Sequence, residues 1–132
     1  MITTSDIATI LYKDCKAFGI SNVYKAPNIP AGEVTEERIA IHAKAGTPEK
    51  IWKKSFVEVN LIVPNLNTGE ADTKRLKDLE RNAYTILDDV YGRFDNTAYI
   101  YSVYSTESIE DVKNKCNYVN VRVLFQVLNV KL

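Results

Sequence analysis

The sequence contains few of the residues that form common catalytic and metal sites. Its 132 residues include one histidine and two cysteines, with no CxxC pair. Zinc sites take Cys, His and carboxylate ligands at short spacing, and this sequence offers no such cluster. Cys15 and Cys116 lie 101 positions apart, and we expect them to be a reduced, cytosolic pair.

An excess of either charge is also absent. Seventeen Lys and Arg residues balance 17 Asp and Glu residues, so the whole chain has no net attraction for nucleic acid or an anionic membrane. No apolar run approaches the roughly 18 residues of a membrane-spanning helix. The first residues lack the basic and apolar regions of a signal peptide, and we expect a cytosolic chain. Five scattered glycines form no GxGxxG or P-loop motif.

Two patterns of apolar residues are present. Spacing of three and four predicts one helix from about Ser5 to Phe18 and a longer one from about Asp72 to Tyr91. Gly19 and Gly92 are the expected stop signals. Alternation predicts strands at 21–26, 38–45, 55–64, 97–105 and 117–130. The intervening stretches are predicted to be an extended loop, a turn that carries Trp52, and a polar excursion, at 27–37, 46–54 and 106–116.

This order of elements predicts one α+β domain over residues 1–132. A chain of this size buries about two-thirds of its unfolded surface, which is enough for a core without cross-links. Short connections between strands favour antiparallel pairing. We therefore predict a two-layer, mainly antiparallel sheet of four to five strands, with two helices packed on one face, in the order α-β-β-β-α-β-β.

Candidate catalytic residues are isolated from one another in the sequence. The single His42 lies on the outward side of a predicted strand, and no motif marks a nucleophile or an orienting acid beside it. A Cys–His pair would require Cys15 or Cys116 to approach it. Asp88 and Asp89 are adjacent on a predicted helix and point about 100° apart, which favours a solvated helix end over a metal site.

A restriction-type nuclease core shares this order of elements and is an alternative. Its site needs an Asp and, on the following strand, an acidic residue and a lysine separated by one residue. Here Glu58 is followed by Asn60 where the lysine would stand. The set of residues that a nuclease site needs is therefore incomplete. We predict no catalytic, cofactor-binding or metal site.

Basic residues are concentrated between His42 and Lys54. Three readings are open for this stretch: a solvated turn, a phosphate or single-strand site, and a protein contact. Tryptophan is the residue type most enriched at protein contacts. The stretch contains Lys44, Lys50, Lys53 and Lys54 close to Trp52.

The sheet face away from the helices has the mixed apolar, amide and charged composition of a protein interface. Ten residues are expected to line it: Arg38, His42, Lys44, Glu58, Asn60, Ile62, Arg122, Leu124, Gln126 and Leu128. Tyrosines at 91, 99, 101, 104 and 118 add aromatic surface near the same sheet, and some of them must belong to the core. The predicted subunit interface comprises Arg38, His42, Trp52, Ile62, Arg122, Leu124, Gln126 and Leu128.

Four stretches together resemble the tail-completion, or tail-terminator, proteins of long-tailed bacteriophages and prophages. The resemblance covers nearly the whole chain and rests on the order of elements, the proline-containing loop after the first strand, and the strand–helix–strand finish. The stretches are "KAPNIPAGEVTEERIAIHAKAGTPEK", "KSFVEVNLIVPN", "ADTKRLKDLERNAYTILDDV" and "NVRVLFQVLNV".

The resemblance implies a structural protein of the virion tail that is made in the bacterial cytoplasm. Such proteins form a ring, usually a hexamer, that caps the tail tube and joins it to the head connector. DNA passes through the hole without sequence-specific binding. The resemblance implies no catalytic residue, cofactor or membrane. The alternatives are a small metal-dependent nuclease or ligand-binding α+β domain, and a head–tail connector protein.

Overall fold

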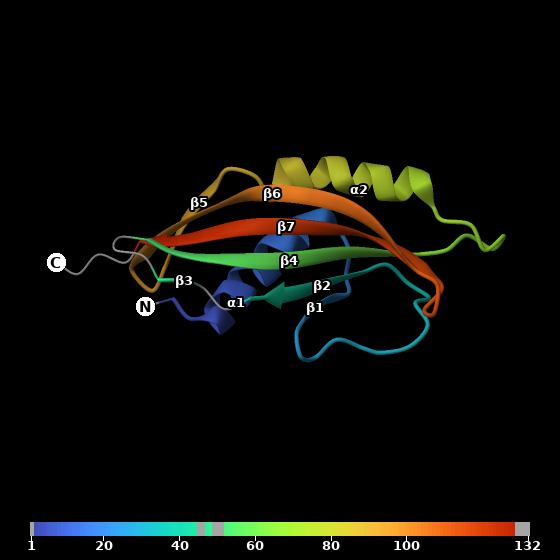
Figure 1. Cartoon of the computed structure of the whole chain (residues 1–132), viewed down its shortest axis with the longest axis horizontal. Helices are drawn as coiled ribbons and strands as arrows, with labels where there is room; N and C mark the ends of the chain where they lie inside the picture. Colours follow the sequence, from blue (N-terminus) through green and yellow to red (C-terminus); the bar gives the residue numbers. More distant parts are fainter. Residues whose placement is uncertain (1, 45–46, 49–51, 129–132) are drawn as a thin grey trace.

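The computed structural model describes residues 2–44, 47–48 and 52–128 (Figure 1). The chain forms two helices and a strongly curled mixed sheet, so the predicted α+β class is confirmed. The elements in chain order are α1 (Thr4–Asp14), a 3-10 turn η1 (Cys15–Phe18), β1 (Val23–Lys25), β2 (Arg38–Ala43), β3 (Thr47–Pro48), β4 (Trp52–Pro64), α2 (Thr73–Ile86), β5 (Val90–Phe94), β6 (Thr97–Asp111) and β7 (Cys116–Leu128).

The sheet has more strands than predicted. Six strands follow one another in the order β1-β2-β4-β7-β6-β5, and the short β3 pairs with β4. All pairs are antiparallel except β1 with β2, which is parallel. The prediction of four to five strands was wrong because β5 and β3 fall where the sequence indicates a helix end and a turn.

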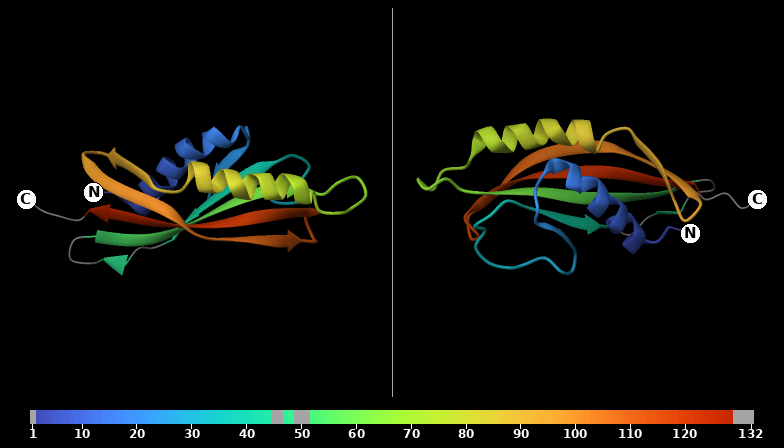
Figure 2. Two further views of the ribbon diagram at one scale, coloured as in Figure 1. Left: turned by 90° about the horizontal axis from the view of Figure 1, so that it is seen from above. Right: turned by 180° about the vertical axis from the view of Figure 1, so that it is seen from behind.

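Both helices lie against the same face of the sheet, which we call the inner face (Figure 2). α1 contacts β1 and β2, while α2 contacts β4, β6 and β7. The inner face and the helices bury one continuous core, whose largest fully buried side chains are Tyr101, Phe125, Ile2, Ile7, Leu11, Ile39, Ile41, Leu61, Leu79 and Leu87. The opposite face, which we call the outer face, has no helix over it among the described residues (Figure 1).

A capping box begins α1 one residue earlier than predicted. The Thr3 hydroxyl accepts a hydrogen bond from the Asp6 amide at 3.1 Å, and the Asp6 carboxylate accepts one from the Thr3 amide at 2.9 Å. These two bonds satisfy amides that a helix start leaves unpaired. Thr3 is therefore the N-cap residue. Gly19, with φ of +76°, follows η1 and is the stop signal that the sequence indicated.

The second helix is shorter than predicted. Asp72 caps it by accepting a hydrogen bond from the Arg75 amide at 3.2 Å, and the helix ends at Ile86 instead of Tyr91. Asp89 has φ of +53°, so the chain turns there and enters β5. Valine and tyrosine occur both in the apolar stripe of a helix and in strands, so the local sequence does not distinguish the two here. Pairing with β6 makes Val90–Phe94 a strand.

The predicted polar excursion at 106–116 is largely the second half of β6. Asp95 and Asn96 both have positive φ, as a two-residue hairpin turn requires, and β6 then runs from Thr97 to Asp111. A β-bulge between Val103 and Ser105 shifts the register by one residue at Tyr104. Because β7 supplies partners along the whole length, polar residues remain in strand conformation here.

Gly92 pairs with Tyr99 across the β5–β6 hairpin, and the Tyr99 ring lies over it. A Cβ at position 92 would stand 2.4 Å from the Tyr99 Oη and 2.6 Å from its Cζ. The Tyr99 ring is held by stacking on Phe125 at 5.0 Å between centroids. Gly92 is thus a close-approach residue of a strand and not the helix stop that the sequence indicated.

Replacing Gly92 by alanine is expected to lower the free energy of unfolding by about 1–3 kcal/mol, because the Tyr99 ring must leave its stacked position. Urea denaturation measures this change. Arg93→Ala on the same strand is the matched control and should stay within about 0.5 kcal/mol of the wild type, because Arg93 is exposed. Equal losses in the two variants would contradict the steric explanation.

Candidate functional site

The outer face is organised in rows of side chains across the strands. The register aligns Arg38, Ile62 and Tyr118 in one row. A parallel row contains His42, Glu58 and Arg122, because alternate residues of paired strands project to the same side. Of the predicted interface residues whose side chains the structure describes, all lie on this face: Arg38, His42, Ile62, Arg122, Leu124 and Gln126.

Polar side chains on the outer face pair with each other. Asn120 donates a hydrogen bond to the Asn60 Oδ1 at 2.7 Å, and Lys44 Nζ lies 3.4 Å from the Glu58 carboxylate. Glu58, the acidic residue of the nuclease alternative, therefore has a lysine partner from outside its own strand. Across residues 2–44, 47–48 and 52–128, no group of three His, Cys, Asp or Glu residues could hold a metal ion.

The segment 26–37 folds over one end of the outer face. The Val34 amide donates a hydrogen bond to the Asn114 carbonyl at 2.9 Å, and Arg38 Nη1 donates one to the Pro30 carbonyl at 3.3 Å. Lys115 Nζ lies 3.7 Å from the Glu33 carboxylate. These contacts connect the segment to the turn between β6 and β7, so the chain itself covers this end of the face.

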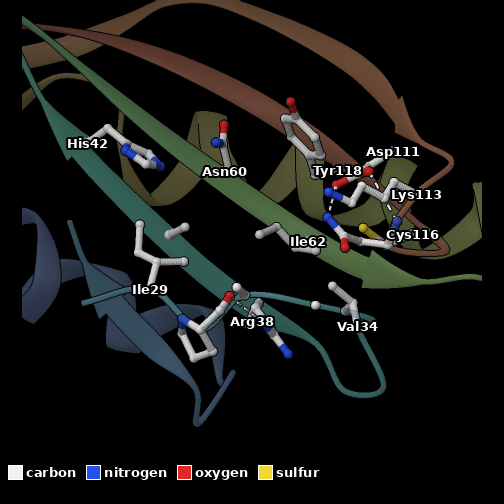
Figure 3. Close-up of a pocket in the computed structure, with 15 residues that line it drawn as sticks. Ile29, Val34, Arg38, His42, Asn60, Ile62, Asp111, Lys113, Cys116 and Tyr118 are labelled. Carbon is white, nitrogen blue, oxygen red and sulfur yellow. Dashed lines mark hydrogen bonds between the residues drawn. The ribbon is translucent and has the colours of Figure 1, made fainter. Parts of the chain in front are cut away.

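A pocket of about 420 Å³ lies beneath this segment (Figure 3). Its apolar lining includes Ile29, Val34 and Ile62, and its polar lining includes Arg38 and His42. The pocket thus contains three of the residues that the sequence assigned to a subunit interface. Arg38, His42 and Ile62 face a hollow within one chain, where a second copy has less access than at the open part of the face.

Cys116 and Tyr118 line the same pocket. Cys116 was expected at the end of the polar excursion, but it begins β7 and is buried. Burial, and next the Asp111 carboxylate, raise the pKa of the Cys116 thiol, while the Arg38 guanidinium lowers it. Burial and Asp111 also raise the pKa of Tyr118. A raised pKa disfavours the thiolate. His42 is level with Glu58 on β4 and Cys116 is level with Pro64, so the two lie far apart along the pocket and form no Cys–His pair (Figure 3).

The rest of the outer face is open and contains an aromatic–arginine cluster. The Arg122 guanidinium carbon lies 4.0 Å from the centroid of the Phe56 ring and 5.7 Å from that of Tyr104. The two rings meet edge to face, with centroids 5.2 Å apart. Leu124 pairs with Phe56 across β4 and β7. We call Phe56, Tyr104, Arg122 and Leu124 the aromatic–arginine cluster.

Sequence reasoning missed Phe56 and the covering segment. Phe56 could have been found, because alternation along 55–64 places it on the same side as Glu58 and Ile62. The path of the segment 26–37 has no local sequence signal. The prediction of a turn at Trp52 was wrong, because β4 begins at this residue. The backbone of Trp52 pairs with that of Leu128, but both side chains lie outside the described residues, as does the side chain of Lys53 and the whole of Lys50.

Asp88 and Asp89 organise the strand edge beside the bulge. The Asp88 carboxylate accepts a hydrogen bond from the Val103 amide at 3.0 Å, and the Asp89 amide donates one to the Ser102 hydroxyl at 3.1 Å. They satisfy edge groups of β6 just beyond the end of α2, where Asp88 is half-buried and Asp89 is exposed. Within the described part of the chain, no helix is long and apolar enough to cross a membrane.

The fold has counterparts among solved structures. One of seven matching chains superposes with a TM-score of 0.60 at 6% sequence identity, covering 98% of this chain and 96% of its own length, and its name describes no function. At this identity the likeness concerns the fold alone. No protein-family model matches the sequence. None of the curated proteins matches it.

Proposed function

We propose that this chain is a structural tail-completion protein of a long-tailed bacteriophage or prophage. Copies of the chain form a ring, expected to be a hexamer, that caps the tail tube and joins it to the head connector. The observation that carries the proposal is the open part of the outer face. There the sheet has no helix over it and presents the aromatic–arginine cluster of Phe56, Tyr104, Arg122 and Leu124.

The composition of this cluster suits a protein contact. Aromatic residues and arginine are enriched in the buried centres of interfaces, and arginine stacked on rings loses less conformational freedom when a partner covers it. Tyr104 has 60% of its surface exposed, although its ring packs on Phe56. A partner that covers Tyr104 would remove this apolar surface from water, which favours association.

The near balance of charges fits a ring through which DNA passes. Strong pairing of lysine and arginine with phosphates releases counterions and holds DNA in place. A chain with 17 basic and 17 acidic residues has no such global attraction. The expected partners are other copies, the tail tube protein and the head connector. Neighbouring genes for a major tail protein and a tape-measure protein would support this assignment.

Charge at the aromatic–arginine cluster should weaken self-association. Arg122→Glu removes the cation that stacks on two rings, and Leu124→Glu places a charge beside Phe56. Either substitution is expected to raise the Kd between copies by about tenfold or more. Sedimentation velocity over a concentration series measures this change, and negative-stain microscopy shows whether rings remain.

Lys77→Glu is the matched control because it reverses one charge on the exposed side of α2. It should leave sedimentation unchanged. The proposal would be contradicted if Arg122→Glu and Leu124→Glu assembled at the same protein concentrations as the wild type, both alone and on tail tubes. Cleavage of plasmid DNA with magnesium or manganese that is lost in Glu58→Ala would favour the nuclease alternative instead.

A further inference from the structure

The two edges of the sheet are both open and differ in charge. β5 pairs only with Thr97–Tyr101 of β6, so the second half of β6 has β7 on one side and no strand on the other within the described residues. α2 flanks the start of this half, where the Thr106 hydroxyl donates a hydrogen bond to the Glu80 carboxylate at 2.6 Å, and the strand then curves toward its turn with β7 (Figure 1). The short β1 forms the opposite edge.

The open half of β6 is acidic. Glu107, Glu110 and Asp111 lie within five positions, and no lysine or arginine occurs in the whole strand. Glu107 and Glu110 are exposed, while Asp111 also accepts hydrogen bonds from Asn114. A strand edge of this length offers unpaired amides and carbonyls to another chain. Two such edges from two copies would repel each other, which disfavours a symmetric pairing of β6 with β6.

Three lysines gather beside the β1 edge, and one carboxylate, Glu36, lies at its start, where it accepts a hydrogen bond from Asn22 at 3.1 Å. Lys16 Nζ and Lys25 Nζ lie 5.1 Å and 5.2 Å from the centroid of the Tyr12 ring, and exposed Lys13 follows Tyr12 on α1. The side chain of Lys25 also reaches the Thr9 hydroxyl at 3.4 Å. A hollow of about 400 Å³ beside this edge is lined by Tyr12, Lys16, Gly19, Ile20, Ser21 and Val23. It has room for a side chain of an incoming strand.

We infer that the open edge of β6 docks against the lysine-rich β1 edge of a second copy. The exposed Glu107 and Glu110 of one edge face the exposed Lys13 and Lys16 of the other, so the contact is attractive only in the head-to-tail orientation. A contact between two different surfaces of the same chain repeats from copy to copy and closes into a ring when its rotation allows. This inference rests on the proposed self-association and names the surfaces that carry it.

A charge swap tests the contact. Glu107→Lys with Glu110→Lys should raise the Kd between copies by about tenfold, and Lys13→Glu with Lys16→Glu should do the same, because each double variant places like charges at the contact. The chain with all four substitutions should return to within about threefold of the wild type, since the edges are again complementary. Sedimentation velocity at low salt measures all three, because salt screens exposed charges.

Lys74→Glu with Lys77→Glu is the control, since it reverses two exposed charges on α2. Hydrogen exchange gives an independent readout: amides at 105–111 should exchange more slowly as the wild-type concentration rises, while those at 67–69 should not change. The inference is overturned if the four-fold variant associates no better than the weaker double variant. It is also overturned if the 105–111 amides exchange at the same rate at every concentration.

The failure of this inference can be distinguished from the failure of the proposed function. If Arg122→Glu abolishes association while the edge variants leave it unchanged, the edge contact is refuted and the structural role is retained. If the charge swap changes association while Arg122→Glu does not, the edge contact is supported and the aromatic–arginine cluster has no role in association. A chain that stays monomeric with unprotected edge amides, alone and with tail tubes, would refute both.

Discussion

Replacing Phe125 by alanine is expected to lower the free energy of unfolding by about 3–5 kcal/mol. Phe125 is fully buried, and its ring stacks on Tyr99 and Tyr101 with centroids 5.0 Å and 5.7 Å away. Removing the ring leaves a cavity beside two aromatic side chains of the neighbouring strand β6, in addition to the lost burial of apolar surface. Urea denaturation at a dilute protein concentration measures the change without contributions from association.

Two variants separate the cavity from a general effect on β7. Phe125→Leu retains much of the volume and should cost about 1–2 kcal/mol. Gln126→Ala changes the next residue on the outer face and should stay within about 0.5 kcal/mol of the wild type. A loss for Phe125→Ala no greater than that for Gln126→Ala would show that the stacked rings do not stabilise the core.

The second large effect is a loss of stability at alkaline pH. Burial, and next the Asp14 carboxylate, raise the pKa of the Cys15 thiol from 9.0 to about 12. In the unfolded chain the thiol ionises near pH 9, while the folded chain still holds the proton. The contribution is therefore fully present below pH 9 and is lost as the pH rises toward 12, at up to about 1.4 kcal/mol per pH unit.

Cys15→Ala isolates this contribution, because the tyrosines and lysines are unchanged between the two chains. From pH 8 to pH 11, the wild type should lose about 2.5 kcal/mol more of its free energy of unfolding than Cys15→Ala does. Urea denaturation at successive pH values under reducing conditions measures the difference. Parallel curves for the two chains would mean that the Cys15 thiol ionises as readily in the folded state as in the unfolded state.

Burial also raises the pKa of Tyr101, with a further contribution from its hydrogen bond to Asp14 at 2.5 Å. This bond joins α1 to β6, and Cys15 follows Asp14 directly. The alkaline effect of Cys15 is thus located where the first helix meets the aromatic core. The pKa of Tyr101 is shifted in the same direction as that of Cys15. Its larger causes, burial and Asp14, are retained in Cys15→Ala, and Cys15 itself adds a smaller contribution.

Local patterns predicted those parts of the fold that depend on a residue and its near neighbours. The alternation of Val119, Val121 and Val123 placed them in the core, where all three are buried. The spacing of Leu76, Leu79 and Ala83 likewise placed one face of α2 in the core, and Gly19 marked the end of the first helical segment. These features follow from backbone geometry within a few positions.

Segments whose conformation depends on a distant partner were mispredicted. Val90–Phe94 continues a helical stripe in the sequence but pairs with β6, and residues 106–111 look like a polar loop but pair with β7. The path of segment 26–37 over the outer face depends on the hydrogen bond between Val34 and Asn114, 80 positions apart in the chain. A single sequence contains no local signal for such contacts.

The amino-acid sequence alone therefore determined the α+β class, the two helices, the inward side of each long strand and most outer-face residues, because period and turn chemistry are local properties. Three features were decided by the tertiary structure alone. They are the part of that face that stays open, the presence of β5, and the placement of an acidic edge and a lysine-rich edge on the same sheet. These features depend on which strands become neighbours, and strand order is set by burial and hydrogen bonding summed over the whole chain.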